Sequence, residues 1–269
     1  MQEKIITSKQ NKYVSQARLT AVNKKFRRKS RLFIIEGIRL LGEAVESNFP
    51  LEYVLVSDKL KNNDQRGIKI LNNIKDMGIE VFTVDHRVFL TIARTETPQG
   101  VVAVAKQPVR SWIDLNLECP ESFILVVDGV QDPGNLGTMI RTAEAVGARG
   151  IITTPSTVDV YNPKVVRSSM GSIFRIPILA ERSIKEIIKV LEDYRVQLIV
   201  ARVDADKIIY DVEFEGALAI VVGNENHGPS EAFKGIPVRI PCKIESLNVS
   251  VAAAVLLYER VRRQYQNSL

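Results

Sequence analysis

The sequence predicts an α/β protein with two domains. Short apolar runs typical of strands alternate with helical patterns in both halves of the 269-residue chain, which favours sheets covered by helices. The strands of the second half are uniformly apolar, as expected for parallel strands that are buried on both faces. Residues 108–120 contain two prolines and mixed polarity, so we expect them to link a first domain of residues 1–107 to a second domain of residues 121–269.

The first domain is expected to begin with a basic amphipathic helix over residues 11–28, with Ser8 as its cap. Apolar runs then predict four strands, at residues 32–36, 51–57, 79–84 and 99–106. Helical patterns between these runs predict three helices, at residues 37–47, 68–77 and 86–93. This alternation predicts a small sheet with helices on its faces.

The second domain repeats the alternation with more strongly apolar strands. Five strands are predicted, at residues 123–127, 150–154, 197–202, 217–222 and 237–240. Three helices are predicted between and after them, at residues 136–146, 183–194 and 249–263. A further helix is expected to start at Asn162 and Pro163, which suit a cap and a first helical residue. Apolar strands separated by helices predict a parallel sheet.

Composition excludes several classes of protein. An apolar content of 45% and a charged content of 25% exclude a disordered chain, and no apolar run reaches the length of a membrane span. The N-terminus lacks the pattern of a secretory signal, so we expect a cytoplasmic protein. The two cysteines, Cys119 and Cys242, lie far apart and outside any CxxC spacing, which excludes a disulfide framework and a cysteine zinc site. No metal site is expected.

The positive charge is concentrated at the N-terminus. The chain has a formal net charge of +6, but residues 1–31 hold ten Lys and Arg against one acid, which gives +9. The other 238 residues hold 27 basic and 30 acidic side chains, which gives −3. Such a basic segment indicates a polyanionic partner, most commonly nucleic acid; the alternative is a solvated tail or disordered basic arm.

Three loops that follow predicted strands are candidates for chemistry, because ligands bind beyond the carboxyl ends of parallel strands. The first, residues 128–141, has glycines on both sides of Asn135 and leads into a helix whose N-terminus favours an anion. Asn135 and Arg141 are its candidate functional residues; alternatively, Asn135 caps the helix and Arg141 lies on a solvated face. Neither a P-loop nor a complete GxGxxG motif is present, which argues against a classical dinucleotide enzyme.

The second and third loops are also polar. Residues 223–230 include Glu225 and His227, but two potential ligands are too few for a metal site, and a hydrogen-bond network within the loop is the favoured interpretation. The third loop places three polar side chains before a helix of small apolar residues, at Ser246, Asn248 and Ser250. A single cap requires only one such residue, so the third loop is a candidate for binding.

Together these loops resemble a known family. The three segments read NLGTMIRTAEA, IVVGNENHGPS and IPCKIESLNVSVAAAVLLYE. In this order they resemble the three signature motifs of the SpoU (TrmH-like) RNA ribose 2′-O-methyltransferases, which belong to the SPOUT class. In the first half, FIIEGIRLLGEAV and ETPQGVVAVA are similar to the ribosomal-protein-like substrate-binding domain, of the L30e type, that many members carry.

The resemblance implies a fold, a cofactor and an assembly. It implies an α/β protein whose C-terminal parallel sheet contains a deep trefoil knot, with a smaller N-terminal α/β domain of the ribosomal protein L30e type. It also implies S-adenosylmethionine bound in the knot, and a homodimer whose two chains build each active site. The implied activity is methyl transfer to a ribose 2′-hydroxyl in structured RNA, with ribosomal RNA favoured and transfer RNA as the alternative; no metal and no membrane are involved.

The motifs and the charge pattern assign the site residues. The resemblance implies a catalytic role for Asn135, Arg141, Glu225, Ser246 and Asn248. It implies cofactor binding by Gly223, Asn224, Ile240, Ser246, Leu247 and Asn248. The cations expected to bind RNA are Lys9, Lys12, Arg18, Lys24, Lys25, Arg27, Arg28 and Arg39. Residues 242–245 contain no glycine where family members often have one, which implies a tighter cofactor loop.

The role of Arg141 follows from its chemistry. A guanidinium group stays protonated in proteins, so we expect Arg141 to hold a phosphate and stabilise a developing alkoxide rather than act as a base. Two other functions are open at this point. A non-catalytic RNA-binding protein would not need all five implied catalytic residues, and an α/β enzyme acting on small metabolites would leave the basic N-terminus unexplained.

Overall fold

The computed structural model describes residues 5–60 and 65–267. Contacts divide the chain into two compact units. The first unit contains Met1–Pro108 together with Tyr161–Phe174, and the second contains Val109–Val160 and Arg175–Leu269. Lys4, one of the cations counted in the basic N-terminus, lies outside the described residues.

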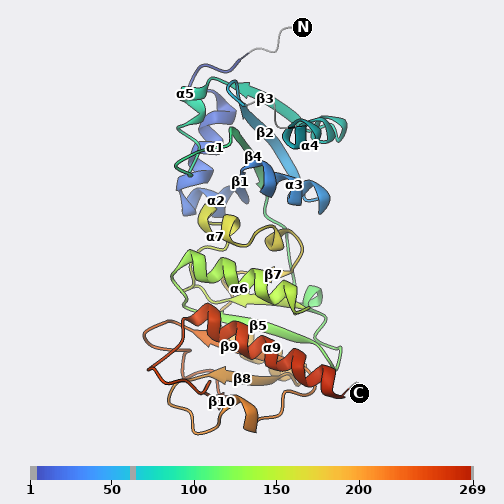
Figure 1. The fold of residues 1–269 in the computed structure, drawn as a ribbon, viewed down its shortest axis with the longest axis vertical. Coiled ribbons are helices and arrows are strands. Elements are labelled where there is room, and N and C mark those ends of the chain that lie inside the picture. The colour runs from blue at the N-terminus through green and yellow to red at the C-terminus, as the bar shows by residue number, and fades with distance from the viewer. Residues whose placement is uncertain (1–4, 61–64, 268–269) are drawn as a thin grey trace. The chain divides into compact units, whose positions relative to one another are not determined.

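The first unit is built on a four-stranded sheet (Figure 1). In spatial order its strands are β1 (Leu32–Glu36), β4 (Val101–Lys106), β2 (Leu51–Ser57) and β3 (Glu80–Val84). β1, β2 and β3 point the same way, and β4 runs antiparallel to both of its neighbours. The carboxyl ends of β1, β2 and β3 therefore lie at one edge of this sheet, beside the amino end of β4.

Helices cover both faces of the first sheet. α1 (Lys12–Val22) and α5 (His86–Phe89) share an apolar core with the strands. α3 (Ile38–Glu46) and α4 (Gln65–Asp76) pack against each other on the other side of the sheet (Figure 1). The predicted alternation of strands and helices in this half is confirmed.

The basic N-terminal helix is divided in two, so the single helix predicted over residues 11–28 is wrong. α1 ends at Val22, and α2 (Lys24–Ser30) begins after Asn23. Asn23 is extended, with φ −113° and ψ 107°, and its side chain accepts a hydrogen bond from the backbone N–H of Phe26 at 3.0 Å. An asparagine amide that satisfies a free N–H in this way starts a new helix. Asn11, and not Ser8, caps α1.

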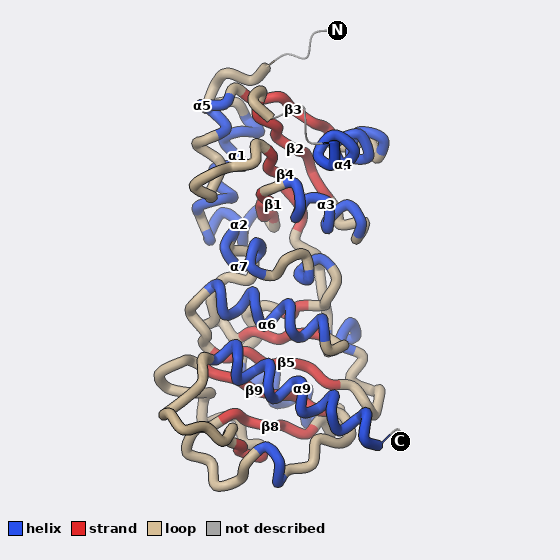
Figure 2. Tube along the Cα trace, viewed as in Figure 1, coloured by secondary structure: helices blue, strands red, loops and turns tan. Residues whose placement is uncertain are grey.

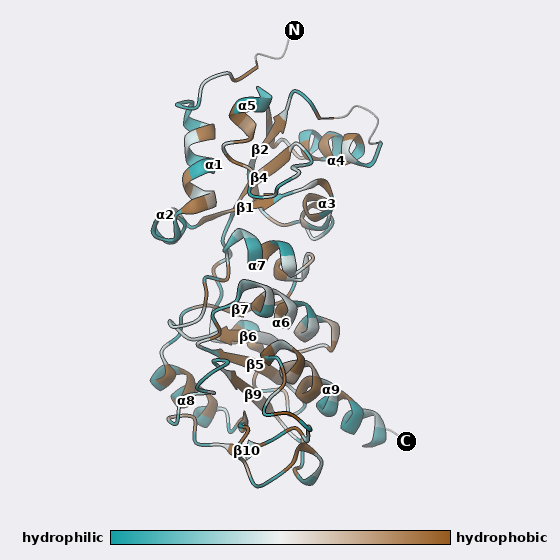
Figure 3. Cartoon of the chain, turned by 60° about the vertical axis from the view of Figure 1, so that its left-hand side comes forward, coloured by the Kyte–Doolittle hydropathy of each residue, from teal (hydrophilic) through white to brown (hydrophobic). Residues whose placement is uncertain are grey.

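The second unit is built on a six-stranded parallel sheet, which confirms the predicted fold class at this level. In spatial order its strands are β10 (Ile236–Val238), β8 (Gln197–Ala201), β9 (Leu218–Gly223), β5 (Phe123–Asp128), β6 (Gly150–Thr153) and β7 (Ile178–Leu179). Every neighbouring pair is parallel. Figure 3 shows β5, β6 and β9 as hydrophobic, as expected for strands buried on both faces.

Helices cover the second sheet as well. α6 (Pro133–Ala145) and α9 (Val249–Asn267) lie side by side (Figures 1 and 2). α8 (Ile184–Asp193) contributes Ile187 and Leu191 to a core that includes side chains of β5, β6 and β9. No helix within residues 5–60 and 65–267 is long and apolar enough to cross a membrane.

The segment predicted as a linker packs with the second unit. It contains a short 3-10 helix, Trp112–Leu115, and the side chains of Leu115 and Leu117 are buried in the core beneath α8. Trp112 donates a hydrogen bond from Nε1 to Glu186 at 3.2 Å. A Cβ added at Gly150 would lie 2.2 Å from Leu115 Cδ2, so this close packing requires a glycine in β6.

The first unit also contains a segment from the second half of the sequence. α7 (Pro163–Ser168) begins after its cap Asn162, as predicted, and contacts β1. The ring of Tyr161 lies 4.8 Å from that of Phe33, and the ring of Phe174 lies 5.0 Å from that of Phe49, measured between centroids. These aromatic contacts make Tyr161–Phe174 part of the first unit's core.

Candidate active site

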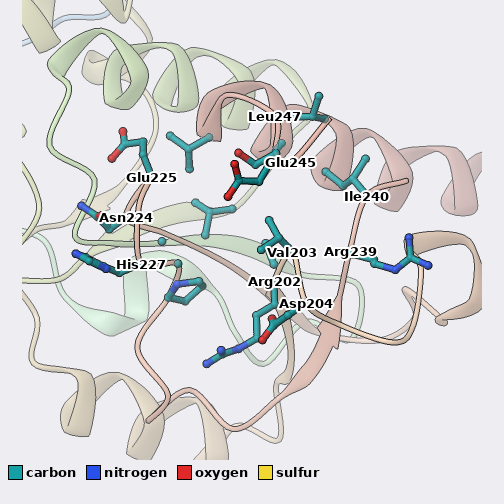
Figure 4. A pocket seen from close by; sticks show the side chains of 18 of the residues that line it. Arg202, Val203, Asp204, Asn224, Glu225, His227, Arg239, Ile240, Glu245 and Leu247 are labelled. Atoms are coloured by element: carbon teal, nitrogen blue, oxygen red, sulfur yellow. The ribbon is translucent and has the colours of Figure 1, made fainter. Parts of the chain in front are cut away.

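A pocket of about 420 Å³ lies at the carboxyl edge of the second sheet (Figure 4). Three segments line it, and each follows a strand: residues 201–204 after β8, residues 222–229 after β9 and residues 238–247 after β10. Because these strands belong to one parallel sheet, their carboxyl ends meet at this edge. The first turns of α9 close the pocket through Val249 and Ala252.

Most residues implied in cofactor binding line this pocket. They are Gly223, Asn224, Ile240, Ser246 and Leu247. Figure 4 shows Asn224 on one side of the pocket and Ile240 and Leu247 across from it. Cys242 and Glu245, from the glycine-free stretch, line the pocket as well.

Asn248 does not line the pocket but starts α9. Its Oδ1 accepts hydrogen bonds from the backbone N–H of Ser250 at 2.9 Å and from Ser250 Oγ at 2.6 Å. The same side chain donates from Nδ2 to Asn135 Oδ1 at 3.0 Å. Asn248 therefore caps the helix and contacts a second loop at once, which explains why this loop has more polar residues than a cap alone requires.

A chain of hydrogen bonds joins the three predicted loops. Asn135 Nδ2 donates to Glu225 Oε1 at 3.0 Å, and Asn135 Oδ1 accepts from Asn248. An ionised carboxylate only accepts hydrogen bonds, so Glu225 dictates that the amide nitrogen of Asn135 faces it. The oxygen of Asn135 then faces the amide nitrogen of Asn248, and the three polar groups have one consistent orientation.

The start of α6 places Asn135 for this contact. Asp132 caps the helix, accepting from the backbone N–H of Asn135 at 2.8 Å, and Pro133 is the first helical residue. The helix thus begins three residues before the predicted Leu136. Asn135 lies inside the first turn and is not the cap, so the alternative interpretation of this residue is wrong.

Arg141 and Ser246 are not joined to this chain of hydrogen bonds. Arg141 is exposed, does not line the pocket and has no hydrogen bond or ion pair with the described residues. It follows Asn135 by six positions, which places the two side chains on different sides of α6. Ser246 is exposed at the pocket wall. The structure therefore joins three of the five implied catalytic residues, Asn135, Glu225 and Asn248, by hydrogen bonds. A fourth, Ser246, lines the same pocket as Glu225.

The sequence interpretation missed a buried polar cluster beneath the pocket. Asp128, the last residue of β5, accepts hydrogen bonds from Thr154 and from the backbone N–H of Ser230. Asn224 donates from Nδ2 to the carbonyl oxygen of Gly129 at 3.0 Å. An acidic residue directly after five apolar strand residues was the available signal.

Two charged side chains hold α9 in place. Arg260 is 4% exposed, and its guanidinium donates to the backbone carbonyl oxygens of Gly216 at 3.1 Å, of Glu121 at 3.4 Å and of Phe214. Burial lowers the pKa of Arg260. Because Asn248 precedes the same helix, these contacts also fix the position of the site.

Glu259 is the second buried charge on α9. It accepts two hydrogen bonds from Arg262, at 2.8 and 2.7 Å, and one from Arg263 at 2.7 Å. The hydrogen bonds from Arg262 are the main reason that the pKa of Glu259 is lowered. The ionised form of this carboxylate therefore stabilises the helix.

The cations expected to bind RNA differ in exposure. Lys9, Lys12, Lys24, Lys25, Arg28 and Arg39 are exposed, and Arg18 is half-buried. Arg27 is 4% exposed and donates from Nη1 to the carbonyl oxygen of Thr20 at 2.9 Å, at the C-terminal end of α1. This guanidinium is a structural group and not a surface contact, because it satisfies helix carbonyls. Figure 3 shows the rest of α2 as largely hydrophilic.

Arg39 lies apart from the basic N-terminal segment. It is in the first turn of α3, at the carboxyl edge of the first sheet, whereas α2 precedes β1 at the opposite edge. Lys59 and Arg87 are exposed near the carboxyl ends of β2 and β3, and so lie at the same edge as Arg39. Exposed cations are therefore present near both the N-terminal and the C-terminal ends of the parallel strands of the first sheet.

The geometry defines a class of protein. A partly apolar pocket at the C-terminal ends of the strands of a parallel sheet is typical of the small-molecule sites of α/β enzymes. Within residues 5–60 and 65–267, no group of three or more His, Cys, Asp or Glu side chains is placed to hold a metal ion. The polar groups that line the pocket are amides, hydroxyls and carboxylates, together with the guanidinium groups of Arg202 and Arg239 and the imidazole of His227.

Comparison with known families is consistent with this class. A model described as the SpoU rRNA Methylase family matches residues 122–258, and one described as an MRM3-like substrate binding domain matches residues 12–103. The chain belongs to the SpoU rRNA methylase family, and it is an S-adenosylmethionine-dependent 2′-O-methyltransferase.

Several relatives match almost the whole chain. The 23S rRNA (guanosine(2553)-2′-O)-methyltransferase RlmP of Bacillus subtilis is 32% identical over 240 residues, covering 87% of this chain and 90% of its own. The 23S rRNA (uridine(2479)-2′-O)-methyltransferase of Streptomyces viridochromogenes is 31% identical over 255 residues, covering 90% and 86%.

Two solved methyltransferase structures are similar in fold to this chain over almost its whole length. The SpoU methyltransferase AviRb from Streptomyces viridochromogenes, in complex with AdoMet, has a TM-score of 0.87 at 28% identity, covering 95% of this chain and 98% of its own. An AdoMet-bound rRNA methyltransferase from Sinorhizobium meliloti has a TM-score of 0.83 at 28% identity, covering 98% and 99%.

Proposed function

We propose that this protein methylates a ribose 2′-hydroxyl of ribosomal RNA in the cytoplasm. The observation that carries the proposal is the chain of hydrogen bonds from Glu225 through Asn135 to Asn248, beside a pocket of cofactor size. Two relatives matched over most of this chain are named for 2′-O-methylation of 23S rRNA, which favours ribosomal over transfer RNA.

The pocket fits S-adenosylmethionine. Its volume of about 420 Å³ lies in the range typical of ligand pockets, and apolar side chains such as Val222, Val238 and Ile240 offer an environment for an adenine ring. Side chains of both charge signs line the pocket, and among them the carboxylates of Glu225 and Glu245 suit the positively charged sulfur of the cofactor. When bound, the cofactor would supply a methyl group carried on a positively charged sulfur: the ribose oxygen would form a bond to the methyl carbon as the carbon–sulfur bond breaks and the neutral thioether leaves. Main-chain groups near Gly223, Ile240 and Leu247 would hold it.

The chain's own residues position the ribose and handle its proton. Such a displacement needs little covalent chemistry from the protein and depends on orientation. In this proposal Glu225, held by Asn135, accepts the hydrogen bond of the 2′-hydroxyl and then its proton as the ribose oxygen bonds to the methyl carbon. Ser246 offers a second polar contact at the pocket wall. Arg141 holds the adjacent phosphate and stabilises the developing negative charge on the oxygen.

A homodimer explains the position of Arg141. This residue lies outside the pocket of its own chain, as expected if it serves the pocket of a second copy. α9 also carries exposed apolar side chains at seven-residue spacing, Val251, Tyr258 and Tyr265, with 48%, 56% and 71% exposure. This spacing places them on one face of the helix, where a second copy would cover them.

Two finer features of the fold belong to the proposal. We infer a deep trefoil knot because the loops after β9 and β10 line one pocket, while the chain returns from the edge strand β10 to place α9 against α6 and β9. We also assign the first domain to the ribosomal protein L30e type, as a substrate-binding domain. The match to a substrate-binding family over residues 12–103 supports this role.

RNA binding is assigned to the exposed cations of this domain. Lys9, Lys12, Lys24, Lys25 and Arg28 supply the N-terminal surface, and Arg39 supplies the other edge of the sheet. Arg18 is half-buried and contributes less surface. Phosphate contacts of this kind make binding dependent on salt.

The proposed function is tested by methyl transfer from labelled AdoMet to deproteinised rRNA and tRNA, with mapping of the modified ribose. We expect transfer to rRNA, and a loss on the order of 10²-fold in Glu225→Gln with AdoMet binding retained. The matched control is Asp114→Asn, which removes a carboxylate remote from the pocket that also accepts a backbone N–H. Transfer to tRNA alone, or RNA binding without transfer, would overturn the proposal in favour of its alternatives.

A further inference from the structure

A buried carboxylate next to the pocket has no part in the proposed chemistry. Asp128 is 6% exposed and does not line the pocket. Its Oδ1 accepts a hydrogen bond from Thr154 Oγ1 at 2.8 Å, and its Oδ2 accepts one from the backbone N–H of Ser230 at 2.8 Å. Burying a charge is costly even when it is hydrogen-bonded, so a carboxylate at this position indicates that the hydrogen bonds it accepts have a role that an apolar side chain could not fill.

The second of these bonds holds the end of the loop that carries Glu225. This loop leaves β9 at Gly223 and turns back on itself before Ser230. The turn is tight, because a Cβ added at Gly223 would lie 2.0 Å from the backbone nitrogen of Pro229. In so short and closed a loop, the position of its end determines the path of its middle.

The residue after Asp128 holds the start of the same loop. The carbonyl oxygen of Gly129 accepts from Asn224 Nδ2 at 3.0 Å. The backbone N–H of Gly129 donates to Thr154 Oγ1 at 3.2 Å and to Thr157 Oγ1 at 3.0 Å. Thr154 thus contacts both Asp128 and Gly129, and both ends of the Glu225 loop are tied to one buried cluster.

The same stretch of chain reaches the middle of the loop. Asn135 follows Asp128 by seven residues and donates its hydrogen bond to Glu225. The stretch from Asp128 to Asn135 therefore contacts the opposing loop at its start, its middle and its end. A shift of the end would therefore move Glu225 away from Asn135.

We propose that Asp128 is a positioning residue, which clamps the end of the loop of residues 223–230 and thereby sets Glu225 against Asn135. This inference rests on the proposed function, because the proposed function is what assigns Glu225 a role in the reaction. Asp128 itself touches neither cofactor nor ribose. The competing explanation is that it stabilises the fold without affecting the geometry of the site.

The test compares Asp128→Ala and Asp128→Asn in the full-length protein. Asparagine keeps one oxygen that accepts from Ser230, so it restores part of what alanine loses. A misplacement of about 1 Å at a reacting group costs on the order of 10²-fold, so we expect kcat to fall about 100-fold for alanine and about 10-fold for asparagine. KM for RNA stays unchanged. Thr154→Val, which leaves the bond to Ser230, has the smaller effect.

A double mutant separates positioning from stability. If Asp128 acts through Glu225, adding Asp128→Asn to Glu225→Ala lowers kcat by less than about 3-fold, because the position of an absent carboxylate has no effect. An equal fold-loss in both backgrounds, or no loss in kcat per folded molecule in the single mutants, overturns the proposal. Asp114→Asn is again the matched control, with wild-type kcat expected.

Hydrogen exchange provides a readout that does not depend on methyl transfer. In Asp128→Asn, the amides of residues 224–228 and of Ser230 should exchange faster, while the same amides in Asp114→Asn should match the wild-type protein. Unchanged exchange in this loop overturns the clamp. If the wild-type protein transfers no methyl group, the proposed function fails, and hydrogen exchange still decides whether Asp128 holds the loop.

Discussion

Replacing Asn135 by aspartate tests the hydrogen-bond chain with almost no change in shape. The amide nitrogen of Asn135 lies 3.0 Å from Glu225 Oε1. Aspartate places a carboxylate oxygen at that position, so a hydrogen bond becomes a contact between two negative charges. The bond to Asn248 is kept, because the other oxygen still accepts it. Asn135→Ala, which removes both contacts without adding charge, is the companion variant.

The magnitude follows from the distance. Two unit charges 3 Å apart repel by about 1.4 kcal/mol at the dielectric constant of water and by ~5 kcal/mol at an effective value of 20. Glu225 is exposed, so the lower end of this range applies, which is about a tenfold effect on a positioned site. We therefore expect Asn135→Asp to be about tenfold less active at pH 8 than Asn135→Ala.

The direction in which the activity of Asn135→Asp changes with pH distinguishes an effect of the added charge from an effect of side-chain shape. Like charges in contact retain a proton to higher pH, and the introduced carboxyl group, once protonated, donates to Glu225 as the amide does. The activity of Asn135→Asp relative to wild type should therefore rise as the pH falls from 8 to 5.5, measured as initial rates of methyl transfer. A ratio that does not vary with pH, or equal activities for the aspartate and alanine variants, would falsify the proposed contact.

Four further outcomes are expected. Mixing inactive Arg141→Ala with inactive Glu225→Ala and allowing subunits to exchange should restore up to about a quarter of wild-type transfer if Arg141 serves the second copy; no recovery places it on its own chain. Replacing Lys9, Lys12, Lys24, Lys25 and Arg28 by glutamine should flatten the dependence of RNA affinity on salt, with a slope change of about 0.7 per lost phosphate contact, while AdoMet affinity is unchanged; a constant slope contradicts this surface. Arg260→Met should lower the free energy of unfolding by about 3 kcal/mol in urea titrations, because three carbonyl oxygens lose their donor; a loss below about 0.5 kcal/mol argues against the anchor. The lowered pKa of Glu259 means that its ionised form stabilises the native state above its unfolded pKa near 4.5, and that this stability is lost as the pH falls through the lower native value; Glu259→Gln should therefore be less stable than wild type at pH 7, with the difference shrinking toward pH 3.

The elements and the three polar loops were predictable because their signals are local. Strands buried on both faces are continuous apolar runs, and the polar residues that end them mark the carboxyl edge of a parallel sheet. Asn162 and Pro163 start α7 as predicted, because cap and first-turn preferences depend on neighbouring residues only. The contact of Asn135 with Glu225 follows from the same topology, since both residues lie at one edge.

Other features depend on partners that are distant in sequence. The sequence around Arg27 resembles that around its exposed cationic neighbours, so it does not predict that Arg27 is buried. The burial arises because its guanidinium group packs against the C-terminal end of α1. β7 has two residues and forms because β6 lies beside it. The linker has no apolar pattern that would reveal the burial of Leu115, since its partners come from the second sheet. Asp128 likewise depends on Thr154 and Ser230, which lie far along the chain.

Tyr161–Phe174 has a consequence for the order in which the protein matures on the ribosome. The first unit ends its continuous stretch at Pro108, yet Phe33 and Phe49, which contact each other, also pack against Tyr161 and Phe174. During synthesis the contacts of Phe33 and Phe49 with Tyr161 and Phe174 cannot form until the chain has emerged as far as Phe174. A messenger cut after codon 108 would therefore yield an aggregation-prone nascent fragment, even though it encodes every strand of the first sheet.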